Sequence, residues 1–119
     1  MRSKPEELRD RTKAFALRII RLFRSLPYKA DTYVLGKQLL RCGTSVAANY
    51  RAVCRARSKA EFISRIAIVA EEADEAVLWL ELLTESGIVK AELTADLLKE
   101  AKELGAILTA SQQTAKRTV

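Results

Sequence analysis

Residues 41–62, RCGTSVAANYRAVCRARSKAEF, contain the end of one predicted helix and the start of the next. Small residues recur at Gly36, Gly43, Ala47 and Cys54, in steps of seven, four and seven. This spacing places them on one side of a helix, where they let a neighbouring backbone approach closely. The sequence therefore predicts a tightly packed helix pair along this side.

A second set of residues on the same predicted helix is basic. Lys37, Arg41, Arg51 and Arg55 are four, ten and four residues apart and are expected to lie roughly opposite the small residues. One helix would thus combine a packing side with a cationic stripe. This combination predicts a binding or assembly surface.

The composition of the 119-residue chain is that of a folded helical protein. Hydrophobic residues make up 49% of it, and four Gly and two Pro leave little material for turns. The start, MRSKPEELRDR, is charged, and no run of about 18 apolar residues follows, which argues against a secretory signal or a membrane span. We expect one all-α domain over residues 1–119, in the cytoplasm.

Capping signals and apolar periodicity divide the chain into four helices. Ser3 with Glu6 and Ser58 with Glu61 have the spacing of capping boxes, and Asp31 or Thr32 is expected to cap the second helix. The short connections predict an antiparallel up-down-up-down four-helix bundle. The first expected helix runs from the capping box at Ser3 to about Ser25, and the second spans about 33–55. The third runs from Ser58 to a stop at Gly87, and the fourth begins near Ala91 and ends in a frayed basic tail at 112–119.

Apolar residues at steps of three and four define the side of each helix that is expected to face the core. They are Leu8, Thr12, Phe15, Ile19, Leu22 and Leu26 on the first helix, Leu35, Leu39, Cys42, Val46, Tyr50 and Val53 on the second, Phe62, Ile66, Val69, Ala73, Val77 and Leu80 on the third, and Leu93, Leu97, Ala101, Leu104 and Leu108 on the fourth.

Three further apolar residues of the third helix, Ile68, Trp79 and Leu82, fall away from this side. A helix that is apolar on two sides needs two partners, and Trp is an effective anchor at protein interfaces. We interpret these residues as an interface between copies of the chain, which would form a homo-oligomer. A broad bundle core that absorbs them is the alternative.

The residue types give little basis for catalysis or for a cofactor. Histidine is absent, so the commonest general base is missing. Cys42 and Cys54 are about 18 Å apart along one helix, too far for a disulfide or a shared zinc ion, and are expected to be small buried thiols. For Glu72 and Glu75, an ion pair with Arg41 or another basic residue of the second helix is the favoured interpretation over a metal site. No enzyme, metal or cofactor is predicted.

Charge is divided unevenly along the chain. Residues 1–65 carry a net charge of +11 and residues 66–119 carry −5, which indicates a polyanionic partner unless the two halves neutralise each other within the bundle. Aromatic residues make up only 6% and are mostly assigned to the core, so phosphate contacts are expected rather than base stacking. The candidate nucleic-acid-binding residues are Arg18, Arg21, Lys37, Arg41, Arg51, Arg55 and Arg57.

The stretch from Leu39 to Val89 resembles the family of 23S ribosomal RNA intervening-sequence proteins. The resemblance rests most on Arg41, Ser45, Val46 and Asn49 of an RxxxSVxxN pattern, and then on Ser58, Glu61, Phe62, Glu75 and the segment Leu80-Glu81-Leu82. After Asn49, many members continue Ile-Ala-Glu-Gly, whereas this chain has YRAVCR, which makes its second helix longer and more basic.

The resemblance implies a small bacterial four-helix bundle whose relatives are encoded within insertions in ribosomal RNA genes. It also implies kinship with the accessory variability protein of diversity-generating retroelements. Relatives of both kinds resemble ring-shaped homopentamers, and the retroelement protein pairs with a reverse transcriptase and binds nucleic acid. The leading hypothesis is therefore a non-enzymatic homo-oligomer that binds RNA or DNA without sequence preference. The alternative is a scaffold that binds an acidic protein.

Overall fold

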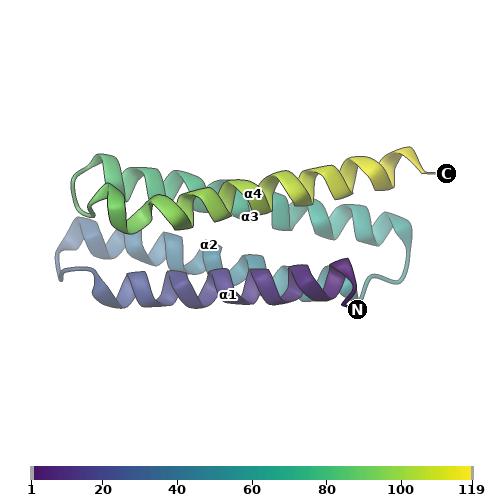
Figure 1. Cartoon of the computed structure of the whole chain (residues 1–119), viewed down its shortest axis with the longest axis horizontal. Coiled ribbons are helices and arrows are strands. Elements are labelled where there is room, and N and C mark those ends of the chain that lie inside the picture. Colours follow the sequence, from purple (N-terminus) through teal and green to yellow (C-terminus); the bar gives the residue numbers. More distant parts are fainter. Residues whose placement is uncertain (1, 119) are drawn as a thin grey trace.

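The computed structural model describes residues 2–118, and these residues form four helices and no strand (Figure 1). Successive helices run in opposite directions along a bundle 50 Å long, so the all-α, antiparallel prediction is confirmed. The start of α1 and the end of α4 lie at the same end of the bundle. The helices are α1 (Lys4–Ser25), α2 (Ala30–Cys54), α3 (Lys59–Glu85) and α4 (Ala91–Arg117).

Two of the predicted helix starts are confirmed in detail. Ser3 and Glu6 form the full capping box, in which the backbone N–H of Glu6 donates to Ser3 Oγ at 3.2 Å. Ser58 Oγ accepts from the backbone N–H of Glu61 at 3.0 Å, but the Glu61 carboxylate pairs with Arg65 instead of closing the box. The prediction of a second complete capping box is therefore half right.

The start of α2 differs from the prediction. Lys29 occupies the N-cap position and makes no side-chain cap bond, so neither Asp31 nor Thr32 caps the helix. Asp31 instead lies in the first turn, where its carboxylate accepts from the backbone N–H of Thr32 at 2.8 Å. An acidic side chain in this turn interacts favourably with the helix dipole, which allows the helix to begin earlier than expected.

The core follows the predicted sides of the helices, with two corrections: Cys54 is exposed, although both cysteines were expected to be buried, and one position differs on α4. Leu93 is 66% exposed, whereas Thr94 is buried and its hydroxyl lies 2.7 Å from that of Thr84. Position 93 lies four residues before Leu97 and position 94 lies three residues before it. Either position therefore continues the apolar series that includes Leu97. Thr94 occupies the inner position, where its hydroxyl bonds that of the half-buried Thr84, so the prediction for Leu93 is wrong.

The last turns of the chain are helical rather than frayed. α4 continues through 112–117 and ends with the backbone N–H of Thr118 donating to the carbonyl of Thr114 at 3.2 Å. Ser111, Thr114 and Ala115 line an apolar groove together with Leu8 of α1 and residues of α2 and α3. These neighbours give the final turns a surface to pack on. Val119, part of the predicted tail, lies outside the described residues.

The close approach of α1 and α2 depends on glycine. A Cβ atom at Gly43 would lie 2.8 Å from Cγ1 and 3.0 Å from Cγ2 of Ile19, whose side chain is fully buried. At Gly36, the nearest atom would be Cδ1 of Leu26 at 2.9 Å, the mobile end of a flexible side chain. Gly43 is therefore the tighter of the two contacts, and the predicted packing role of this residue is supported.

We expect Gly43→Ala to lower the free energy of unfolding by about 1 kcal/mol or more, because overpacking a β-branched core residue costs about 1–3 kcal/mol and exceeds the gain in helix propensity. Gly105→Ala is the matched control, since its Cβ would meet only Ala73 at 3.9 Å. That substitution should stabilise the protein by about 0.5–1 kcal/mol. Urea denaturation measures both, and equal effects of the two substitutions would contradict the close packing.

Candidate nucleic-acid interface

The C-terminal half of α2 forms the floor of a wide, shallow groove of about 900 Å³. Ala47, Ala48 and Ala52 lie along this floor, with Thr44 and with Ala16 of α1 beside them. Because α2 packs against α1 and α3, its third side faces outward, and short side chains there leave the space above the helix open. The charged lining of the groove consists of Arg51, Arg55, Arg57, Glu61 and Arg65.

The arginines come from consecutive segments that the turn between α2 and α3 brings together. Arg51 lies in the last turn of α2, Arg55 is the C-cap residue, and Arg57 belongs to the connection that follows. Arg65 projects from the second turn of α3. A smaller hollow next to the groove is lined by Arg51, Cys54, Arg55 and Arg9 of α1, which adds a further cation at this end of the bundle.

The groove is strongly positive. Among residues 2–118, Arg51, Arg55 and Arg57 form no ion pair, while Arg65 Nε lies 2.9 Å from Glu61 Oε1 one turn earlier. Four arginines and one glutamate therefore leave the lining with a net charge of +3. Exposed guanidinium groups present several N–H donors in a planar fork that matches the geometry of phosphate oxygens.

The sequence predicted that the small residues and the basic stripe lie on opposite sides of α2. This prediction is wrong for Ala47. Ala47, Arg51 and Arg55 line the same groove, because residues four apart fall on adjacent turns of one helix side. Gly43, by contrast, faces Ile19 of α1. The small residues thus serve two sides: the glycines allow helix packing, and Ala47 contributes to the groove.

The other predicted cations lie elsewhere. Lys37 is fourteen residues before Arg51, about 21 Å away along the helix axis, and its Nζ lies 5.2 Å from the centre of the Tyr33 ring. Arg18 and Arg21 belong to α1 and do not line the groove. The predicted nucleic-acid-binding residues therefore do not form one site, and only Arg51, Arg55 and Arg57 among them line the groove.

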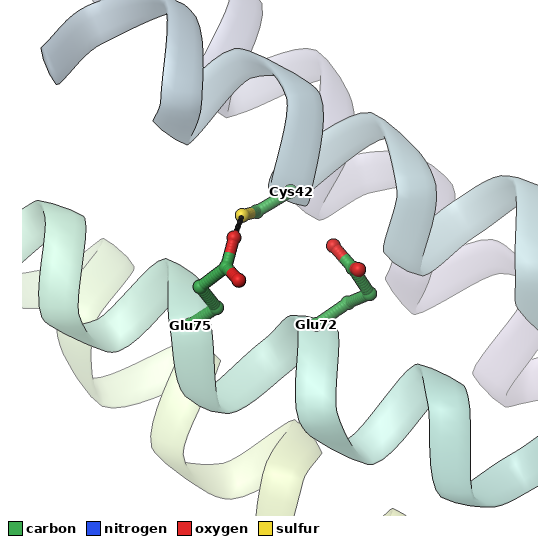
Figure 2. Close-up of side chains that lie close together, drawn as sticks. All are labelled: Cys42, Glu72 and Glu75. Atoms are coloured by element: carbon green, nitrogen blue, oxygen red, sulfur yellow. Dashed lines mark hydrogen bonds between the residues drawn. The ribbon is translucent and has the colours of Figure 1, made fainter.

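Arg41, one of the candidate nucleic-acid-binding residues, is engaged within the protein, which is the alternative that the sequence had left open. Its Nη1 lies 3.2 Å from Glu72 Oε2, and its Nη2 bonds Glu75. Glu75 also accepts from the Cys42 thiol at 2.5 Å and from Trp79 Nε1 at 3.3 Å, as Figure 2 shows for the thiol. This network joins α2 to α3 and removes Arg41 from the cations available to a ligand.

The same cluster contains a set of metal-ligand types in which Cys42 joins Glu72 and Glu75, the two carboxylates for which the sequence favoured an ion pair over a metal site. The donor atoms of Cys42, Glu72 and Glu75 all lie within 4.8 Å of one another (Figure 2). However, burial and the hydrogen bond to Glu75 raise the pKa of the Cys42 thiol to about 12, so it remains a neutral donor at pH 7. Since Arg41 supplies a positive charge to both carboxylates, we interpret the cluster as a link between helices.

Part of the predicted interface between copies lies on the outer surface of α3. Ile68 and Leu82 are exposed, as predicted, and Leu78 is exposed beside them at 46%. The sequence analysis missed Leu78, although its position four residues before Leu82 places both on one side of the helix. Trp79 differs from the prediction, because it packs against the core and donates to Glu75. Contact of this surface with another copy remains a prediction.

Several members of the groove were also missed, among them Ala48, Ala52 and Arg65. An alanine at each of 47, 48 and 52 was visible in the sequence, but nothing there showed that this side of α2 lacks a partner. Arg65 lies on another helix, and its place beside Arg51 depends on the turn at 55–58. Periodicity within one helix could not have found it.

Comparison with known proteins agrees with the fold and with the RxxxSVxxN resemblance. The family model of the 23S rRNA-intervening sequence protein matches residues 6–110. The chain belongs to this family. A crystal structure of a protein of unknown function from the S23 ribosomal protein family of Bacteroides thetaiotaomicron VPI-5482 is similar, with a TM-score of 0.86 and 32% identity over 93% of this chain and 99% of that one. The comparison with curated proteins gave no match.

These findings establish the family and the helical fold, and they leave the biochemical role to be argued from the surface of the molecule. The family and the similar structure are both of unknown function. Within residues 2–118, no helix has the length and apolar character needed to cross a membrane.

The network around Glu75 predicts a dependence of stability on pH. Hydrogen bonds from Cys42 and Trp79 and the charge of Arg41 hold the pKa of Glu75 below its ordinary value. A lowered pKa stabilises the folded protein above the ordinary carboxyl pKa of about 4.3, and this contribution is lost as the pH falls through the lowered value.

We therefore expect Glu75→Gln to reduce the free energy of unfolding at pH 7 and to flatten its decline below about pH 4.3. Urea denaturation at a series of pH values measures this effect. Glu71→Gln, which removes an exposed carboxylate from the same helix, is the matched control and should leave the decline in place. A decline that is equally steep in the Glu75 variant would show that the network contributes nothing to stability.

Proposed function

We propose that this protein binds RNA or DNA without sequence preference, through the arginine-lined groove at the C-terminal end of α2. The observation that carries the proposal is the group of Arg51, Arg55 and Arg57, which form no ion pair within residues 2–118, beside a floor of alanines. No catalytic step and no cofactor is part of it. An accessory role beside a reverse transcriptase or another nucleic-acid enzyme would use this same surface.

The chemistry of the groove favours phosphate contacts over base recognition. Its polar lining consists of guanidinium groups, one carboxylate and one threonine hydroxyl, and its floor is a smooth row of methyl groups. Neutralisation of phosphates by arginine releases counterions and provides most of non-specific affinity. The alanine floor allows a sugar-phosphate backbone to approach α2 without a steric barrier.

We also propose that copies of the chain associate through the outer surface of α3, formed by Ile68, Leu78 and Leu82. These three side chains are exposed at 45%, 46% and 39%, while the other side of α3 is buried in the core. A ring of five subunits is the assembly that the family resemblance implies. Such a ring would present the groove several times and raise the apparent affinity for a long polyanion.

The arginine proposal predicts that Arg51→Glu with Arg55→Glu lowers the affinity for duplex DNA and for structured RNA alike, by about tenfold or more at low salt, with a shallower salt dependence. Fluorescence anisotropy across a salt series measures both quantities. Lys99→Glu with Lys102→Glu, an equal change of charge on exposed positions of α4, is the control.

If both double variants weaken binding to the same degree, net charge rather than the groove determines affinity. If the parent protein binds neither nucleic acid, the alternative of a scaffold for an acidic protein partner is favoured.

The assembly proposal predicts that Ile68→Glu with Leu82→Glu converts the oligomer into a folded monomer, because two buried charges at an interface would lack partners. Light scattering after size-exclusion chromatography measures the mass. Leu93→Glu, at the most exposed leucine of α4, should leave the assembly intact. A parent protein that is monomeric at micromolar concentration would refute the proposal.

A further inference from the structure

Two exposed tyrosines lie at the connection between α1 and α2: Tyr28 belongs to the connection and Tyr33 to the first turn of α2. This connection is at the end of the bundle opposite the turn between α2 and α3, where the groove lies (Figure 1). Tyr28 is 100% exposed and Tyr33 is 51% exposed. The expectation that the aromatic residues mostly belong to the core therefore fails for these two. Tyrosine rings left in water gain nothing from burial, and at binding surfaces they provide rigid contact area at a low entropy cost.

A pocket of about 220 Å³ lies between these two tyrosines. Phe23, Leu26 and Pro27 contribute its other apolar walls, and Arg24 lies at its edge. Sites for drug-sized ligands usually exceed about 300 Å³, so this pocket is suited to a single flat ring system.

The surroundings of the pocket are positively charged. Arg24, Lys29 and Lys37 lie on the segment 24–37 with one acidic residue, Asp31, and none of the three cations forms an ion pair within residues 2–118. The Lys37 ammonium group is 5.2 Å from the centre of the Tyr33 ring, a cation–π distance. Flat aromatic surfaces beside free cations match a ligand that has both planar rings and negative charges.

We propose that this end of the protein binds single-stranded nucleic acid, with an unpaired base stacked on Tyr28 and Tyr33 and the neighbouring phosphates held by Arg24, Lys29 and Lys37. The proposal rests on the function proposed above and adds its substrate class. Stacking on an aromatic ring requires a base that is free of its own partner, so a duplex would engage the arginine groove but not the tyrosines. An apolar protein segment fits less well, because it would take three cations out of water without pairing them.

The test measures anisotropy for three labelled probes of about 20 nucleotides: a mixed-sequence single strand, the corresponding duplex, and a single strand without bases. Tyr28→Ala with Tyr33→Ala should lower the affinity for the single strand by about tenfold or more, and change that for the other two probes by less than about threefold. Tyr28→Phe with Tyr33→Phe keeps both rings and should bind like the parent. Thermal melts followed by circular dichroism check that the variants remain folded, as the exposure of both residues predicts.

The outcomes separate this inference from the groove proposal. If the alanine variant binds all three probes like the parent while Arg51→Glu with Arg55→Glu weakens them, the groove stands and base stacking is refuted. If the alanine variant loses affinity equally for the probe without bases, the tyrosines do not read bases. If it loses self-association but no affinity, the tyrosines form a protein contact. If the parent binds none of the probes, both proposals fail together.

Discussion

The contact of Gly43 with Ile19 is the constraint on which the arrangement of α2 depends. With the Cγ1 and Cγ2 atoms of Ile19 at 2.8 and 3.0 Å from the position of a Cβ atom, no other residue fits there without displacing a fully buried side chain. This contact fixes how closely α1 and α2 approach and how α2 is rotated about its own axis. The rotation in turn decides which residues of α2 face α3 and which face outward.

Once this rotation is fixed, the chemistry of α2 is divided among three sides. One side meets α1 through the glycines, and a second meets α3 through Cys42 and the ion pairs of Arg41 with Glu72 and Glu75. The third side has no partner in the bundle and carries Ala48, Ala52 and Arg55 at the groove. The arginines gather there because the first two sides have no place for an unpaired guanidinium group.

The sequence predicted the helices and most of the core because these depend on residues three and four positions apart in one helix. It predicted the pairing of Arg41 with Glu72 and Glu75 because antiparallel neighbours bring those positions level. It could not place Arg65 beside Arg51, since that depends on the turn between α2 and α3, nor choose Thr94 over Leu93, since both fit the period. Exposure of Tyr28 and Tyr33 was missed because composition does not report which aromatic residues lie in a connection, as Tyr28 does, or on the outer side of a helix, as Tyr33 does.

The uneven charge of the chain is only partly cancelled within the bundle. Arg11 pairs with Glu100 at 2.5 Å and with Glu103 at 3.2 Å, and Arg41 pairs with two glutamates of α3, so the acidic half neutralises the middle of the molecule. Of the cations that form no ion pair within residues 2–118, Arg51, Arg55 and Arg57 lie at one end of α2 and Arg24, Lys29 and Lys37 lie near the other, while further ones lie along α1 and α4. Tyr33 and Arg51 are about 27 Å apart along α2. In the proposed arrangement, a single strand long enough to span this distance engages both ends at once, and the second contact benefits from a raised effective concentration. A duplex lacks the free base that one of these ends requires, so the preference for single strands arises from the position of two tyrosines rather than from charge.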